Sequence, residues 1–174
     1  MDLSIVIKRA NELTPAEQQG VDTVTGQAFA GDSGGQDYTY TGGDWQAMGS
    51  LEGKIVASLG IVDRDATAGG LPVRLGGIGG VSTHPEWQRR GLGSALIQSA
   101  NAFLQDELKV DFGLLVCSEK RSHFYAGLGW QVVKGPLLVD QPSGKVELKA
   151  VTMILPCAQQ TWPEGVIDLC GLPW

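Results

Sequence analysis

The sequence has few charged residues and no surplus of positive charge. Charged residues make up 18% of the 174 residues, and 19 acidic side chains outnumber 13 Lys and Arg, for a formal net charge of −6. Binding to nucleic acid would need a basic face, so we expect no nucleic-acid partner. The negative charge suits a cationic substrate, although mild acidity is also an ordinary way to keep a protein soluble.

Long apolar runs are absent as well. No stretch approaches the roughly 18 apolar residues of a membrane span, and a hydrophobic content of 43% is typical of a soluble globular protein. The start, Met1-Asp2-Leu3-Ser4, lacks the basic residues and apolar core of a signal peptide, so we expect a cytoplasmic protein without a membrane partner. A chain of this length fits a single domain, residues 1–174.

Cysteine is scarce. The three cysteines, Cys117, Cys157 and Cys170, are an odd number, and their spacing matches neither a zinc site nor a disulfide framework. We therefore expect reduced thiols and no metal site.

The common nucleotide-binding motifs are missing too, but one glycine-containing turn, residues 88–93, leads from an apolar strand into a helix. No Gly-Lys-Ser/Thr follows it, and its spacing is not G-x-G-x-x-G. Gly91 and Gly93 allow several N–H groups to approach one ligand, and the start of a helix favours anions. Arg89 and Arg90 add positive charge. The turn predicts a pyrophosphate site, but by itself it fits equally well a helix start with two exposed arginines.

Hydrophobic patterning predicts a mixture of strands and helices. Thr14-Pro15-Ala16-Glu17 is a capping box with proline in the first helical position, which predicts a helix over 15–29. The segment with Pro136, Pro142 and Gly144 should be exposed. Further helices follow the turn at 88–93 and the expected N-cap, Ser118. The predicted strands are residues 4–8, 45–51, 54–63, 71–83, 110–117, 130–133 and 150–155.

Residues 31–44 form a long loop without periodicity. It contains several glycines, three aspartates and two tyrosines. Loops of this length are usually functional or disordered. Aromatic side chains among carboxylates suit a cationic ligand, which favours a substrate wall over a connector.

The predicted strand 71–83 contains four glycines, at positions 76, 77, 79 and 80. Glycine ordinarily weakens a strand and often marks a bulge or a close approach of another backbone. The alternative is that these glycines only ease packing.

Two motifs together resemble the GNAT acetyltransferases. Gln88-Arg89-Arg90-Gly91-Leu92-Gly93 resembles the family signature Gln/Arg-x-x-Gly-x-Gly/Ala, and residues 124–130, Phe-Tyr-Ala-Gly-Leu-Gly-Trp, resemble its Phe-Tyr…Gly-Phe/Trp helix and turn. The resemblance implies an α/β (α+β) fold with a mixed, mostly antiparallel sheet of six or seven strands. The sheet would be splayed between the fourth and fifth strands and flanked by helices. Acetyl-CoA is the implied acyl donor.

The resemblance also assigns residues to the donor. A tyrosine at position 125 would lie near the sulfur and act as general acid, unless it is only a core residue, and neither His84 nor His123 is given a catalytic role. The implied cofactor-binding residues are Val81, Ser82, Thr83, Gln88, Arg89, Arg90, Gly91, Leu92, Gly93 and Ser94.

Within the family, the chain resembles the aminoglycoside 2′-N-acetyltransferases, antibiotic-resistance enzymes, in residues 24–32, 80–87 and 128–136 and in its terminal tryptophan. That likeness implies that Asp32 and the free carboxylate of Trp174 bind ammonium groups, for which charged hydrogen bonds are strong. Asp32 could instead cap a loop, and Trp174 could be a packing plug. Weaker substrate-binding candidates are Asp37, Asp44 and Glu147.

The sequence departs from that subfamily at its proposed base. Gly79-Gly80-Val81 stands where these enzymes carry a glutamate before Gly-Val, and Val116 replaces a serine. We expect water on the carbonyl groups of Gly79 and Gly80, leading to Asp32, to take the proton, and a kasugamycin-type aminoglycoside to suit the altered pocket. The alternatives are a GNAT acting on another small amine or a protein amine, and a non-catalytic acetyl-CoA sensor. A homodimer is left open.

Overall fold

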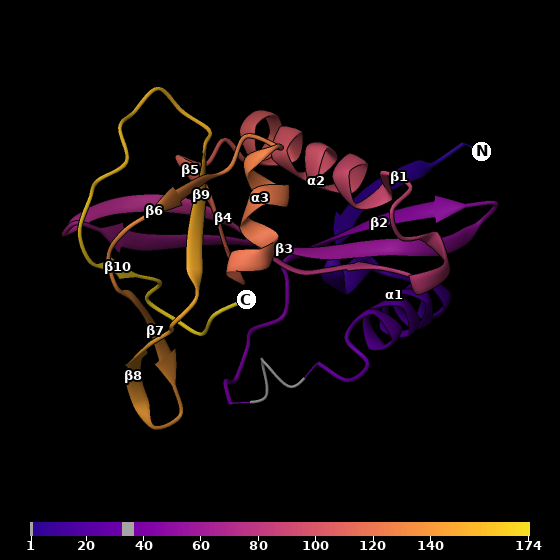
Figure 1. Cartoon of the computed structure of the whole chain (residues 1–174), viewed down its shortest axis with the longest axis horizontal. Helices are drawn as coiled ribbons and strands as arrows, with labels where there is room; N and C mark the ends of the chain where they lie inside the picture. Colours follow the sequence, from indigo (N-terminus) through magenta and orange to yellow (C-terminus); the bar gives the residue numbers. More distant parts are fainter. Residues whose placement is uncertain (1, 33–36) are drawn as a thin grey trace.

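The fold is built around two long antiparallel strands, β3 (Lys54–Ala68) and β4 (Leu71–Thr83), which run across the width of the molecule (Figure 1). The computed structural model describes residues 2–32 and 37–174. Met1 of the expected N-terminal segment and residues 33–36 of the expected substrate wall therefore lie outside the described residues.

The described residues contain a sheet of ten strands, rather than six or seven. Its order is β6-β9-β5-β4-β3-β10-β7-β8, and β2 also pairs with β3 and with β1. The other eight strands are β1 (Ser4–Arg9), β2 (Trp45–Leu51), β5 (Phe112–Cys117), β6 (Gln131–Val133), β7 (Leu137–Gln141), β8 (Gly144–Glu147), β9 (Val151–Pro156) and β10 (Ile167–Asp168).

Helices flank this sheet, with α2 above and α1 below the β3–β4 pair in Figure 1. Thr14 caps α1 as expected, because its hydroxyl accepts the Glu17 N–H at 3.2 Å while the Glu17 carboxylate accepts the Thr14 N–H at 2.9 Å. Within residues 2–32 and 37–174, no helix has both the length and the apolar character needed to cross a membrane. The helices are α1 (Pro15–Ala28), α2 (Leu92–Ala102), α3 (Glu119–Ala126), the 3₁₀ turns η1 (Ala10–Glu12) and η2 (Pro85–Trp87), and the π-helical η3 (Phe103–Leu108).

The apolar face of α2 packs on the sheet through Leu96, Ile97 and Ala100, all fully buried. Leu104 of η3 continues this contact and lies directly against Gly76, where a Cβ atom would overlap its side chain. One of the four glycines in β4 therefore permits close packing of a neighbouring side chain, which is the structural alternative considered above.

The segment between β6 and β9 is not the exposed stretch that its prolines and glycine predict. Leu137, Val139 and Leu148 are buried, and the segment forms the β7–β8 hairpin. Strand β10 pairs with β7 in parallel and with β3 in an antiparallel arrangement, so it joins the hairpin to the main sheet. The expected exposure holds at residues 142–144, the tip of the hairpin, but Leu137 and Val139 of its first strand are buried.

Strands β4 and β5 are splayed, as the family resemblance implies. They pair in parallel only through Leu75–Phe112, Gly76–Gly113 and Gly77–Leu114. Beyond Gly77 the two strands separate, although β4 continues to residue 83 and β5 to residue 117. The separation leaves one edge of β4 unpaired next to the start of α2.

A β-bulge lies at the same level in β4. Ser58 pairs with Ser82 and Gly60 pairs with Gly79, so two residues of β4 oppose the single residue Leu59. Gly80 has a φ of +61°, which a residue with a Cβ rarely adopts. Bulges redirect the main chain, and this one lies in the pairing of β4 with β3, along the part of β4 that β5 no longer pairs with.

Candidate active site

The side chain of Trp174 lies in the opening between β4 and β5. Its indole Nε1 donates to the carbonyl oxygen of Leu114 at 3.2 Å, and Leu114 is the last residue of β5 that pairs with β4. The indole ring covers Gly77, where a Cβ atom would overlap it, and a Cβ atom on Gly79 would lie 2.6 Å from the Trp174 carbonyl carbon. Two of the β4 glycines are therefore needed because the tail of the chain approaches β4 closely.

The residues before Trp174 are anchored by three different parts of the fold. Each anchor uses a main-chain carbonyl group, so the path of the tail is fixed independently of its side chains. The carbonyl oxygen of Gly171 accepts from the N–H of Asp140 (2.9 Å), that of Leu172 from the guanidinium of Arg64 (2.5 Å), and that of Pro173 from the N–H of Thr41 (2.7 Å).

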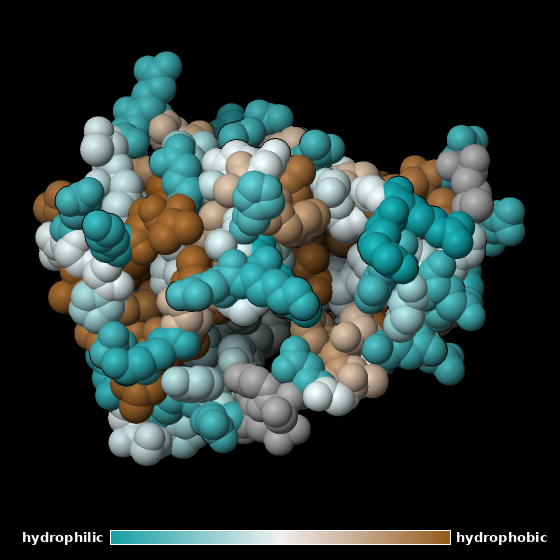
Figure 2. All heavy atoms as spheres, in the orientation of Figure 1, coloured by the Kyte–Doolittle hydropathy of each residue, from teal (hydrophilic) through white to brown (hydrophobic). Residues whose placement is uncertain are grey.

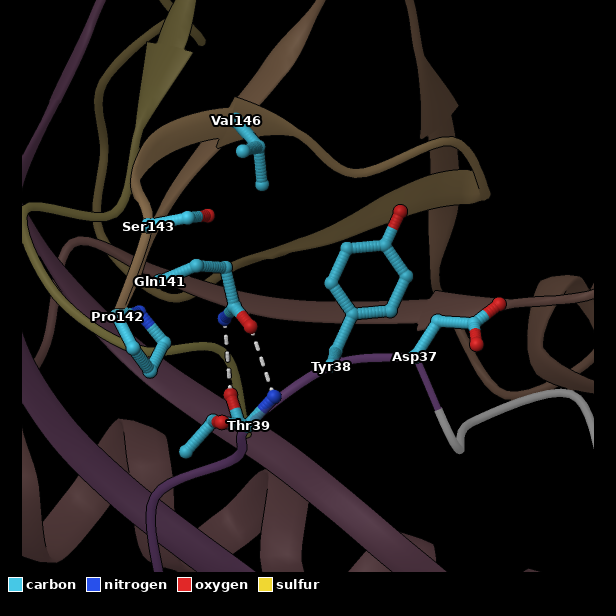
Figure 3. A pocket seen from close by; sticks show the side chains of 7 residues that line it. All are labelled: Asp37, Tyr38, Thr39, Gln141, Pro142, Ser143 and Val146. Atoms are coloured by element: carbon cyan, nitrogen blue, oxygen red, sulfur yellow. Dashed lines mark hydrogen bonds between the residues drawn. The ribbon is translucent and has the colours of Figure 1, made fainter.

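The loop before β2 forms a wall next to this tail. The side-chain amide of Gln141 on β7 clamps Thr39, because its Oε1 accepts the Thr39 N–H at 2.8 Å and its Nε2 donates to the Thr39 carbonyl at 2.9 Å (Figure 3). Figure 2 shows a hollow in the middle of this face, close to where Figure 1 marks the C-terminus. A pocket of about 400 Å³ in the wall is lined by Asp37, Tyr38, Thr39, Gln141, Pro142, Ser143 and Val146.

The acidic candidates have different environments. Asp32 is exposed just after α1, and Asp37 is exposed at the rim of the pocket in Figure 3. Asp44 is engaged in the fold, because its carboxylate accepts the N–H of Asp63 at 2.9 Å. Glu147 lies on β8, the last strand in the sheet order, with its carboxylate 3.7 Å from Lys149. Among the described residues, no hydrogen bond or ion pair joins the carboxylate of Asp44 or Glu147 to Trp174.

The turn at residues 88–94 has the conformation of an anion-binding turn. Gly91 is the N-cap of α2 with a φ of +81°, and Arg89 also has a positive φ, of +60°. The side chain of Gln88 donates to the carbonyl group of Thr83 at 3.1 Å, which ties the turn to the end of β4. Arg90 packs on the ring of Trp87 at 4.7 Å. The first N–H groups of α2 have no partner within the helix and are available to a phosphate.

Two of the three β4 residues expected to bind the cofactor lie on its open edge. The N–H of His84 donates to the carbonyl oxygen of Val56 on β3 at 2.8 Å. The direction of the N–H and C=O groups alternates from residue to residue along a strand, so these groups of Val81 and Thr83 are directed away from β3. Ser82 is directed the other way. Its side chain is buried and lies 3.0 Å from the hydroxyl of Ser58, so it is held within the fold.

Tyr125 of α3 is buried near the end of β5, and its environment favours the protonated phenol. Burial raises the pKa of Tyr125, and Cys117 raises it further, while Arg121 opposes the shift. The ring packs edge-on against Phe124 at 5.0 Å. Among the described residues, none hydrogen-bonds to the Tyr125 hydroxyl. The hydroxyl oxygen is not fully buried. The hydroxyl therefore reaches the surface, where a substrate could meet it.

Two structurally important residues were missed in the sequence. Arg64 on β3 contacts the tail, and Asn101 on α2 accepts the indole N–H of Trp130 at 3.1 Å and donates to the carbonyl of Leu128 at 3.1 Å. Neither residue belongs to a motif, and each acts on residues far away in the sequence. Asn101 at the end of a helical apolar pattern gives no signal of its own.

The comparison with protein families agrees with this geometry. A family model described as an acetyltransferase (GNAT) domain matches residues 11–133, which is more than half of the chain. The chain belongs to the GNAT acetyltransferases, which use acetyl-CoA as the acetyl donor. The exposed edge of β4 and the turn before α2 fit this donor: the edge has free main-chain groups for an extended arm, and the turn has N–H groups and arginines for a pyrophosphate.

Individual relatives are more distant. The aminoglycoside 2′-N-acetyltransferase of Mycolicibacterium fortuitum is 25% identical over 134 residues, which are 77% of this chain and 68% of that protein. An acyl-CoA N-acyltransferase from Pseudomonas aeruginosa superposes with a TM-score of 0.62 at 19% identity, covering 88% of this chain and 99% of that chain. A GNAT family acetyltransferase from Brucella melitensis, in complex with acetyl-CoA, gives 0.62 at 16% identity over 94% of each chain.

Proposed function

We propose that this acetyltransferase acetylates an amine of an aminoglycoside, the 2′-amine being the first candidate, and that the acceptor binds beside Trp174. The observation that carries the proposal is the fixed position of Trp174 in the opening between β4 and β5, next to Gly79. In this proposal acetyl-CoA enters the opening from the side of α2. A group anchored there lies where an acceptor amine must approach the acetyl group.

The wall around the tail suits a polyamine sugar. The loop from Asp37 to Asp44 contributes hydroxyl and carboxylate groups, and its Thr41 is bonded to Pro173, so this wall and the tail form one surface. Hydrogen bonds to ammonium groups are about twice as strong as neutral ones, and acceptors held by the fold need little reorganisation. Asp32 and the main-chain oxygen atoms of Trp174 are the proposed ammonium ligands.

The tail also explains how the site works without the glutamate found in the resembling enzymes. In this proposal the main chain of Trp174 takes the space of that side chain beside Gly79. Its oxygen atoms, together with water on the carbonyl groups of Gly79 and Gly80, accept the proton that the ammonium group must lose before attack. The neutral amine nitrogen then forms the new bond to the acetyl carbon, and it loses its second proton to the same water as the acetamide forms.

Tyr125 supplies the second proton transfer. The carbon–sulfur bond breaks as the amide forms, and the departing thiolate needs a proton. The phenol of Tyr125 is protonated at neutral pH, as any tyrosine phenol with a pKa of about 10 is, and burial raises its pKa further. It can therefore donate its proton to the sulfur and be reprotonated from solvent, so that the products are an acetamide and a free thiol.

A screen of amine acceptors tests the proposal. Purified protein is incubated with acetyl-CoA and either kasugamycin or a 2-deoxystreptamine aminoglycoside with a free 2′-amine. Release of the thiol is followed over time, and the acetylated product is identified by mass spectrometry. We expect a product 42 mass units heavier with at least one aminoglycoside. Acetylation of a peptide amine but of no aminoglycoside would reject the proposed acceptor class. Binding of acetyl-CoA without turnover on any amine would favour a sensor.

A further inference from the structure

Arg64 makes two contacts with the tail of the chain. Its Nη1 donates to the carbonyl oxygen of Leu172 at 2.5 Å, and its guanidinium carbon lies 5.1 Å from the centre of the Trp174 ring. A Cβ atom on Gly171 would lie 2.9 Å from the same Nη1. The half-buried guanidinium is therefore fitted between the main chain of residues 171–172 and the aromatic face of residue 174.

The usual partner of an arginine is missing at this position. Among the described residues, no carboxylate forms an ion pair with Arg64. Burial lowers the pKa of Arg64, and the nearby charges of Asp44 and Asp140 oppose this shift only in part. Arg74 on the adjacent strand behaves differently, because it forms a two-point ion pair with Asp63 at the surface. The tail is thus the principal direct partner of Arg64.

The position of Arg64 in the sheet separates it from the donor site. It pairs with Leu75, which lies at the start of the stretch where β4 and β5 are still joined. The turn that precedes α2 follows the opposite end of β4, after residue 83. A change at Arg64 should therefore reach the opening through the tail and leave the pyrophosphate turn intact.

We propose that Arg64 is a positioning residue that holds Trp174 in the opening between β4 and β5 and so forms the acceptor side of the active site. The proposal rests on the proposed function in so far as it concerns acceptor binding. A guanidinium suits this role because it can donate in its plane to a carbonyl group while its face covers an indole ring. Neither lysine nor an apolar residue can do both.

Steady-state kinetics test the functional part, with the best amine from the acceptor screen. Arg64→Met, which keeps the length of the side chain, should raise the KM for the acceptor tenfold or more and leave the KM for acetyl-CoA within twofold. Arg64→Lys keeps the charge and a donor but loses the planar stacking, so an intermediate KM is expected. Arg74→Met is the matched control on the neighbouring strand and should leave both KM values unchanged. An unchanged acceptor KM in Arg64→Met, or an equal rise in both KM values, would overturn the proposal.

A second measurement needs no acceptor. The protein is labelled with 5-fluorotryptophan, and the Trp174→Phe variant identifies the ¹⁹F resonance of Trp174. In Arg64→Met this resonance should shift or broaden while those of the other tryptophans stay in place, and Arg74→Met should leave the spectrum unchanged. If wild type acetylates no amine, the proposed function fails. In that case the spectrum still tests whether Arg64 positions Trp174. A displaced Trp174 resonance in Arg64→Met supports this role, and an unchanged one overturns it.

Discussion

A Cβ atom on Gly79 would lie 2.6 Å from the carbonyl carbon of Trp174, so strand β4 and the tail of the chain exclude any larger side chain at this position. The aminoglycoside 2′-N-acetyltransferases that the sequence resembles carry a glutamate here. That side chain and the observed path of the tail cannot occupy the same space. Glycine at position 79 is therefore required for the observed path of the tail.

Gly79→Ala should displace the tail. The added methyl group meets main-chain atoms rather than the end of a flexible side chain, and overpacking of this kind typically costs about 1–3 kcal/mol. We expect a lower free energy of unfolding in urea and a higher KM for the acceptor. Gly26→Ala is the control, since a Cβ atom there meets nothing within 4 Å and alanine favours the helix. Wild-type stability and KM in Gly79→Ala would contradict the observed position of the tail.

Gly91→Val should weaken binding of acetyl-CoA. The residue is the N-cap of α2, and a branched side chain there would both strain the turn and cover the N–H groups that face the pyrophosphate. We expect the dissociation constant measured by calorimetry to rise at least tenfold, which corresponds to about 1.4 kcal/mol.

Gly70→Val separates backbone strain from loss of the binding site. Gly70 has a φ of +78°, close to the +81° of Gly91, and a Cβ atom at either position meets nothing within 4 Å. The two variants should lose similar stability, but only Gly91→Val should lose affinity. Equal affinities in the two variants would remove the turn from the donor site.

Tyr125→Phe should lower kcat by roughly 10² to 10⁴, the usual contribution of a general acid, without changing the affinity for acetyl-CoA. Stopped assays of thiol release together with calorimetry give both quantities. Lys120→Met is the control, because Lys120 is exposed on the same helix and has no role in the proposed site. A wild-type kcat in Tyr125→Phe would make Tyr125 a packing residue only.

The pH dependence of kcat should reflect the raised pKa of Tyr125. The protonated phenol is the active form, and burial moves its pKa above the ordinary value of about 10. As pH rises, kcat should hold through pH 9 and fall only above pH 10, and this alkaline limb should be absent from the residual activity of Tyr125→Phe. An alkaline fall near pH 8 in wild type would point to a different acid.

Asn101→Leu should destabilise the protein. The substitution keeps the volume but leaves the buried indole N–H of Trp130 without its acceptor, and an unsatisfied buried donor costs about 1–3 kcal/mol. Urea unfolding measures the loss, and Gln98→Leu, at an exposed position of the same helix, should stay near wild type. Equal midpoints in the two variants would show that the Asn101 contact contributes nothing to stability.

Local features of this protein could be predicted from contiguous residues. The capping box at Thr14 and the turn before α2 each depend on a few neighbouring side chains and their allowed φ values, and the structure has both. The family and its splayed sheet followed from two such short motifs. The fold class was confirmed because these two motifs occur together with one arrangement of strands.

The proposed acceptor side of the site depends on contacts that only the tertiary structure brings together. The contacts that build it join residues 60 to 108 positions apart: Trp174 with Leu114, Thr39 with Gln141, and Arg64 with Leu172. Sequence pattern showed the glycines of β4 but not what they approach. It predicted an exposed segment at Pro136, Pro142 and Gly144 but not that β7 joins the sheet through β10. No local propensity encodes such pairings, because their free energy comes from burial and hydrogen bonds that exist only once the strands have been brought together.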